Sequence, residues 1–117
     1  MTLTVGMITV DSLDAVALGR WWAEQVGGEV VQENDGWFVV VAVPGAAYQL
    51  AFQKVERPTP GKNKVHLDLV AEDLDAEVAR LESAGADQVA TQTMEDFRWV
   101  TMADPEGNYF DVAQAEG

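Results

Sequence analysis

The sequence predicts an α+β fold in which a module of one strand, one helix and three strands occurs twice. Three observations support this. Short alternating or β-branched segments are bounded by turn residues, and two segments show the apolar spacing of amphipathic helices. The tripeptide Leu-Asp-Ala also occurs at residues 13–15 and again at residues 74–76. A repeat of about 60 residues is typical of an internal duplication.

The first module is predicted over residues 1–55. Val5–Val10 alternates as a strand, and a helix follows over Ala15–Val26 with Val16, Trp21, Trp22 and Val26 on its apolar side. Gly27-Gly28 ends this helix, because glycine tolerates the left-handed conformation found there. Three further strands are predicted at residues 29–32, 37–43 and 47–55, with a turn at Asn34-Asp35-Gly36.

A linker rich in proline and glycine, residues 56–63, leads to the second module over residues 64–117. The strand Lys64–Val70 has an apolar side and a side that carries His66 and Asp68. The following helix is predicted to begin at the N-cap Asp73, to bury Leu74, Val78 and Leu81, and to end at Gly85. Strands are then predicted at residues 86–91, 97–102 and 109–113, with a tight turn at Asp104–Asn108. Since one module alone buries little apolar surface, we expect residues 1–117 to form one domain.

Composition excludes several classes of function. The chain has no cysteine, so disulfides, thiolate catalysis and cysteine-ligated metals are excluded. The net charge of −13 disfavours nucleic acid and anionic membrane surfaces as partners. No apolar run approaches the roughly 20 residues of a membrane span, and the N-terminal residues lack the pattern of a signal peptide. We therefore expect a cytoplasmic protein.

Three stretches carry a resemblance to a known family: Asp14–Gly28, Pro60–Leu69 with Asp73–Asp75, and Asp104–Phe110. Through them the chain resembles the vicinal oxygen chelate superfamily, which includes glyoxalase I, bleomycin-resistance proteins, fosfomycin-resistance proteins and extradiol dioxygenases. It is most similar to the small bacterial glyoxalase-like proteins of one domain. The resemblance implies two βαβββ modules that form a cupped eight-stranded mixed sheet with helices on its outer face. It also implies a small-molecule site in the cup and a homodimer.

The resemblance further implies that metal ligands stand on the cup face of the first, fourth, fifth and eighth strands. By position these are Met7, Gln49, His66 and Asp111. Alternation agrees, because the neighbouring residues along each strand are apolar and suit packing under a helix. Asp68 belongs to the same face, and Tyr109 and Trp99 offer a wall on which a planar ligand can stack. The predicted ligand-binding residues are Met7, Gln49, His66, Asp68, Trp99, Tyr109 and Asp111.

This donor set is weak for a metal. Met7 offers a soft thioether, a poor ligand for magnesium, manganese or nickel, and Gln49 carries no charge. The remaining metal candidates are Gln49, His66 and Asp111, so we predict a degenerate site that holds no metal or a divalent ion. Asp111 is the candidate catalytic residue, as a base. Since the chain has a single histidine, the two-histidine triad of an extradiol dioxygenase cannot form in one chain.

Three functions are compatible with the sequence. The first is binding of a small organic molecule in the cup, with or without a metal. The second is a metal-dependent lyase or isomerase of the glyoxalase type, which uses Gln49, His66 and Asp111. The third is a dimeric interaction module with a vestigial cup. The structural alternatives are also open: His66 hydrogen-bonded to a carboxylate, Asp111 partly solvated, and Trp99 and Tyr109 engaged only in packing.

Overall fold

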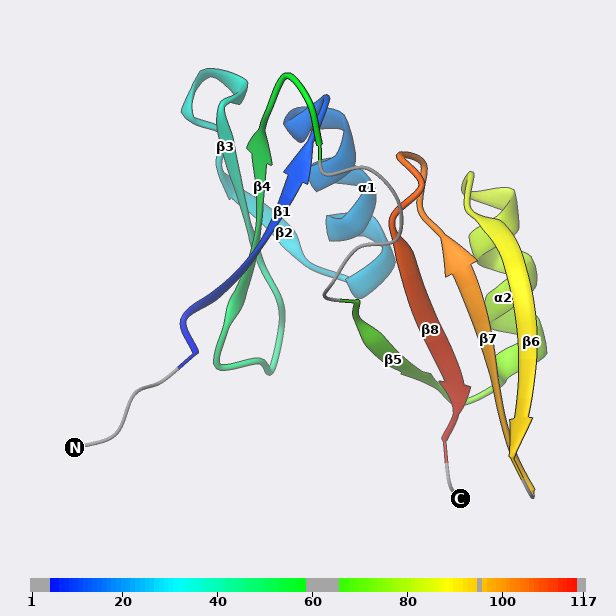
Figure 1. Cartoon of the computed structure of the whole chain (residues 1–117). Coiled ribbons are helices and arrows are strands. Elements are labelled where there is room, and N and C mark those ends of the chain that lie inside the picture. The colour runs from blue at the N-terminus through cyan, green and yellow to red at the C-terminus, as the bar shows by residue number, and fades with distance from the viewer. Residues whose placement is uncertain (1–4, 59–65, 95, 116–117) are drawn as a thin grey trace. The chain divides into compact units, whose positions relative to one another are not determined.

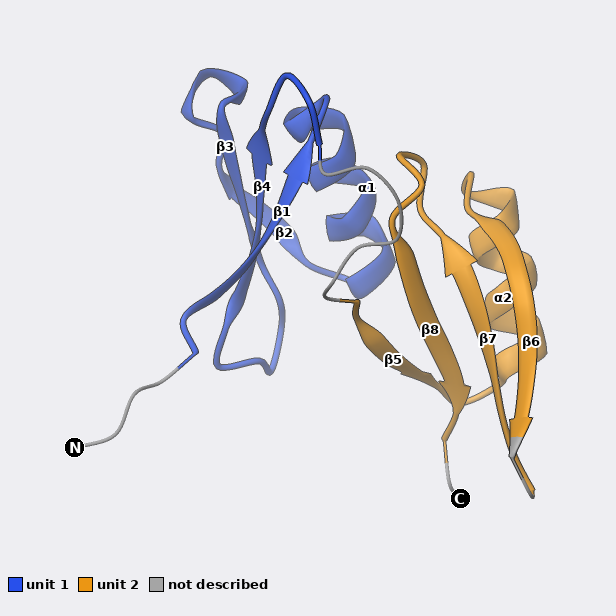
Figure 2. Ribbon diagram, viewed as in Figure 1, with its two compact units in different colours: residues 1–58 blue, residues 59–117 orange. Residues whose placement is uncertain are grey.

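A computed structural model describes residues 5–58, 66–94 and 96–115. The chain divides into two compact units, residues 1–58 and residues 59–117 (Figure 2). Each unit contains a four-stranded mixed sheet and one α-helix against that sheet (Figure 1). This confirms the α+β fold class and the two βαβββ modules. Most of the predicted linker, with the first residues of the strand predicted at Lys64, lies outside the described residues.

The predicted strands and helices are all present, and most of their bounds agree within three residues. The largest difference is at the strand predicted from Lys64, which begins at Asp68. In the first unit the elements are β1 (Met7–Ser12), α1 (Ala15–Val26), β2 (Glu29–Gln32), the short 3-10 helix η1 (Asn34–Gly36), β3 (Phe38–Ala42) and β4 (Gln49–Lys54). In the second unit they are β5 (Asp68–Ala71), α2 (Leu74–Ser83), β6 (Asp87–Met94), β7 (Phe97–Ala103) and β8 (Tyr109–Gln114). None of the helices in the described part of the chain is long and apolar enough to cross a membrane.

The two sheets share one topology. The strand order is β1-β4-β3-β2 in the first unit and β5-β8-β7-β6 in the second. In each sheet the first and last strands of the module pair in parallel, and the other pairs are antiparallel. The identical order supports an internal duplication, as the repeated tripeptide predicted.

Helix α1 buries a different face from the predicted one. Asp14 caps its start by accepting a hydrogen bond from the Ala17 amide at 3.1 Å. Trp22 is buried as predicted, whereas Val16, Trp21 and Val26 are only half-buried. The reason is a close approach at Gly19, where an added Cβ would lie 2.6 Å from Val39 Cγ1 on β3. The residues buried on α1 are Ala15, Leu18, Gly19, Trp22 and Ala23.

Helix α2 agrees with the prediction. Asp73 caps it by accepting a hydrogen bond from the Ala76 amide at 3.2 Å, and Leu74, Val78 and Leu81 are buried. These side chains cover one face of the second sheet, where the alternate residues of β7 and β8 are buried as well. The opposite face of the sheet, which α2 does not cover, is available for polar side chains. The buried residues of these two strands are Val100, Met102, Ala103, Phe110 and Val112.

The turn between β7 and β8 is built around one buried carboxylate. Asp104 is only 3% exposed, and its Oδ1 accepts hydrogen bonds from the amides of Glu106 and Asn108, each at 2.9 Å. The Asn108 side-chain amide also donates to both carboxylate oxygens, at 3.1 and 3.0 Å. Gly107 takes a positive φ of 85° within this turn. The turn therefore fixes how β8 returns along β7.

Replacing this carboxylate should destabilise the second unit. Asp104→Ala leaves two backbone amides and one side-chain amide without their acceptor, and we expect the free energy of unfolding to fall by about 2–4 kcal/mol. Urea unfolding followed by circular dichroism measures the change. Asp104→Asn is the matched control, because it retains the Oδ1 acceptor and should lose less than half as much. Equal losses for the two variants would contradict this account of the turn.

Candidate functional site

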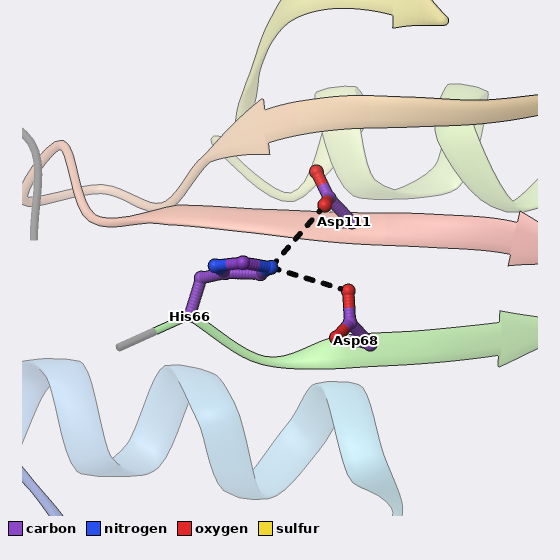
Figure 3. Close-up of side chains that lie close together, drawn as sticks. All are labelled: His66, Asp68 and Asp111. Atoms are coloured by element: carbon purple, nitrogen blue, oxygen red, sulfur yellow. Dashed lines mark ion pairs between the residues drawn. The ribbon is translucent and has the colours of Figure 1, made fainter. Parts of the chain in front are cut away.

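Three chemistry-bearing side chains lie together in the second unit. His66 Nε2 is 3.3 Å from Asp68 Oδ1 and 3.5 Å from Asp111 Oδ2 (Figure 3). His66 lies two residues before β5, Asp68 is the first residue of β5, and Asp111 belongs to the adjacent strand β8. The Asp111 amide donates to the carbonyl of Leu67 at 2.9 Å, so the pairing with β8 extends back toward His66. We call His66, Asp68 and Asp111 the carboxylate–histidine cluster.

Asp111 is the anchored member of the cluster. Its Oδ1 accepts a hydrogen bond from Thr101 Oγ1 at 2.7 Å, which leaves Oδ2 directed toward His66. Its side chain is 21% exposed, against 41% for His66 and 77% for Asp68. The hydrogen bond from Thr101 therefore orients the partly buried carboxylate of Asp111, whereas His66 and Asp68 are more exposed. Thr101 was not among the residues predicted from the sequence, although its alternation with Trp99 along the strand indicates that it shares this face.

Aromatic side chains continue the face that carries the cluster. Trp99 precedes Thr101 by two residues on β7 and therefore shares its face. The rings of Phe97 and Trp99 lie 5.7 Å apart with an interplanar angle of 37°. Tyr109 is half-buried and precedes Asp111 by two residues on β8. Phe97, which is 42% exposed, is a second residue that the sequence analysis missed, although the same alternation indicates it.

The other two predicted ligand-binding residues lie in the first unit. Met7 and Gln49 are directly paired in the parallel ladder of β1 and β4. Met7 is 38% exposed and Gln49 is half-buried. The structure thus brings the predicted residues together as two groups, each within its own unit. The first group is neutral, and the second holds the carboxylates and the imidazole.

The face around the cluster carries negative charge. Among the described residues of the second unit the arginines are Arg80 and Arg98. Arg80 pairs with Glu77, and Arg98 pairs with Asp75 at 2.8 Å, so both are engaged by carboxylates of α2. No described lysine or arginine is paired with the cluster. The cluster therefore suits a ligand that brings a positive charge or a hydrogen-bond donor.

The cluster also has the donors of a metal site. One imidazole nitrogen and two carboxylate oxygens lie within 4.8 Å of one another. A tetrahedral ion with bonds of about 2.1 Å holds its donors about 3.4 Å apart, and the two separations from His66 Nε2 are 3.3 and 3.5 Å. Nitrogen with carboxylate oxygen suits zinc, manganese, iron or nickel. In this set Asp68 stands beside His66 and Asp111, whereas the sequence analysis named Gln49 as the third ligand.

The arrangement offers two kinds of chemistry. A carboxylate held by Thr101 has a defined orientation, so Asp111 can accept a hydrogen bond or a proton from a bound molecule. His66 can donate through Nε2 to either carboxylate or, when deprotonated there, bind an ion. Both uses compete for the same atoms, because Asp111 Oδ2 cannot serve as ligand and base at once.

Two βαβββ modules with the same strand order define the fold class of this chain. The sequence model described as Glyoxalase-like domain matches residues 7–113. The chain therefore belongs to the glyoxalase-like domain family. This confirms the resemblance to the vicinal oxygen chelate superfamily. No match was found among curated protein sequences.

Solved structures of this superfamily share the fold. A member of the glyoxalase/bleomycin resistance protein/dioxygenase superfamily from Sphaerobacter thermophilus is 23% identical, with a TM-score of 0.74 over 97% of this chain and 98% of that chain. A family enzyme from Burkholderia phytofirmans is 17% identical, with a TM-score of 0.82 over 97% and 100% of the two chains. TnmS3, an antibiotic binding protein from a Streptomyces species, is 24% identical, with a TM-score of 0.72 over 98% of each chain. At these identities the likeness is one of fold.

Proposed function

We propose that this protein binds a small organic molecule on the open face of the second sheet, with its polar end at the carboxylate–histidine cluster. The observation that supports this most strongly is the placement of Trp99 two residues from Thr101, which holds Asp111. A planar ring can stack on Trp99 and Phe97 while a donor group reaches Asp111 Oδ2. The fold is shared with TnmS3, which is an antibiotic binding protein, and this supports binding as the function.

The charge of the cluster selects the polar end of the ligand. Two carboxylates and one imidazole favour an amine, amidine or other hydrogen-bond donor over an anion, because an anion placed there would meet like charge. The aromatic pair favours a flat, apolar body. We therefore expect a planar aromatic compound with a positively charged or donor-rich substituent, the description that fits several antibiotics.

Metal-free bleomycin, which combines flat heteroaromatic rings with amines, is a suitable probe. We expect isothermal titration calorimetry to detect binding, Trp99→Leu to weaken it about tenfold through lost stacking, and Asp111→Asn to weaken it about tenfold through lost charge. Trp37→Leu is the matched control, since Trp37 is a 60% exposed tryptophan of the first unit, and it should leave the affinity unchanged. If Trp99→Leu and Trp37→Leu both bind like the unsubstituted protein, the proposed face is wrong.

A metal-dependent lyase or isomerase is the second candidate function. The donor separations around His66 Nε2 support it, because they match those of a tetrahedral ion. A bound divalent ion would polarise a carbonyl or stabilise an enediolate. In that case His66, Asp68 and Asp111 would hold the ion, with Thr101 orienting Asp111. Gln49 is a further candidate ligand, as the family resemblance implies.

Metal content separates these two functions. If the protein binds its ligand without a metal, protein purified without an affinity tag should contain well below one ion per chain. Met7 and Gln49 are neutral, so neither contributes a negative charge that would attract a metal ion. Elemental analysis that shows about one nickel, zinc or manganese per chain, lost in His66→Ala, would establish the second function instead. Asp68→Asn then tests the third donor. Asp75→Asn, which alters a carboxylate paired with Arg98, is the control and should leave the metal content unchanged.

We further propose that the chain forms a homodimer. Large apolar side chains remain exposed on it, among them Val70 at 74% and Phe97 at 42%. Exposed apolar surface, where it is contiguous, commonly marks an interface, and the family resemblance also implies a dimer. Light scattering should give a mass of about twice the 12.7 kDa of one chain. A single-chain mass across the micromolar range would contradict the dimer, and with it the third candidate function, an interaction module with a vestigial site.

A further inference from the structure

A cavity of about 340 Å³ lies in the first unit, where the start of α1, the η1 turn and the ends of β3 and β4 meet. Every residue that lines it belongs to the first unit, and none belongs to the carboxylate–histidine cluster. Its volume is at the lower end of the range for small-molecule sites. The cavity is therefore a candidate site for a second ligand.

An exposed tryptophan forms one wall of the cavity. Trp37 is 60% exposed, and the ammonium of Lys54 lies 5.1 Å from the centroid of its ring. The Lys54 amide donates to the Trp37 carbonyl at 2.9 Å, so the backbone holds the two residues side by side. The indole face thus has a geometry that accepts a cation, and the lysine of the chain itself occupies it.

Two carboxylates also line the cavity, Asp14 and Asp35. Asp14 Oδ1 accepts the hydrogen bond from the Ala17 amide that caps α1. Asp35 is exposed, and within the described part of the chain its side chain has neither a hydrogen bond nor an ion pair. Its backbone φ is +56°, a left-handed conformation that costs energy for a residue other than glycine. With one ammonium and two carboxylates, the lining has a net negative charge.

Apolar groups complete the lining. Leu13 is 54% exposed, and Val16 is half-buried on the first turn of α1. The η1 turn packs closely on this helix, since an added Cβ at Gly36 would lie 3.5 Å from Val16 Cγ2. A small hydrocarbon group can therefore contact Leu13 and Val16 while a charged group reaches the indole.

We propose that this cavity binds a small organic ammonium ion. Its charged head replaces the Lys54 ammonium over the Trp37 ring and lies near Asp35, and its alkyl part contacts Leu13 and Val16. An aromatic face attracts quaternary ammonium groups, and the two carboxylates add electrostatic attraction. The net charge of −13 raises the local concentration of such cations.

Choline and its uncharged carbon analogue 3,3-dimethylbutanol test the proposal, because the two probes have nearly the same shape. Saturation-transfer difference NMR on their methyl protons, at constant ionic strength, reports binding. We expect choline to bind with a dissociation constant on the order of millimolar and the alcohol to bind about three- to fivefold more weakly. Lys54→Met retains the side-chain stem and removes the competing charge, so it should tighten choline binding about threefold.

Variants assign the effect to this cavity. Trp37→Leu should remove most of the choline signal, and Asp35→Asn should weaken binding, while Trp99→Leu in the second unit should leave the signal from this cavity in place. Urea unfolding of each variant checks that it is folded. Equal binding of the alcohol and choline, absence of choline binding, or looser binding in Lys54→Met would each overturn the proposal. Trp99→Leu should weaken bleomycin binding and Trp37→Leu should not, whereas the opposite is expected for choline. One proposal can therefore be contradicted while the other holds.

Discussion

The candidate site depends on the register of one strand, β8. Its parallel ladder with β5 places Asp68 level with Asp111, and its antiparallel ladder with β7 places Thr101 level with Asp111. Side chains alternate along a strand, so a shift of one residue would turn Asp111 toward α2 and bring Phe110 to the open face. The buried carboxylate of Asp104 and the hydrogen bonds that it accepts hold this register from the turn. The geometry around His66 follows from that constraint.

The helix on each sheet determines which face is available for chemistry. Leu74, Val78 and Leu81 of α2 cover one face of the second sheet and bury its apolar residues. The carboxylates of the same helix also pair with Arg80 and Arg98, which keeps these positive charges away from the cluster. The open face therefore retains a negative charge beside two aromatic rings. That combination favours binding of a flat, donor-rich molecule.

The duplicated module has diverged in chemistry while its strand order has stayed the same. In the first unit, the ladder of the two parallel strands begins with Met7 opposite Gln49. The corresponding ladder of the second unit begins with Asp68 opposite Asp111. A neutral pair and a charged pair thus occupy equivalent places. The first unit has a different charged feature, the cavity beside Trp37, which Lys54 and Asp35 line. The two modules consequently offer different surfaces for binding.

The sequence by itself determined the modules, both helices and the face of α2, because apolar periodicity, N-caps and glycine act over a few neighbouring residues. It also placed His66, Asp68 and Asp111 on one face through alternation and the family resemblance. Only the tertiary structure decided which face α1 buries, since the close approach of Gly19 to Val39 joins residues far apart in the chain. The same holds for the hydrogen bond from Thr101 to Asp111 and for the place of Lys54 over Trp37. These contacts depend on how the strands pair, and the register of that pairing cannot be predicted from a local sequence pattern.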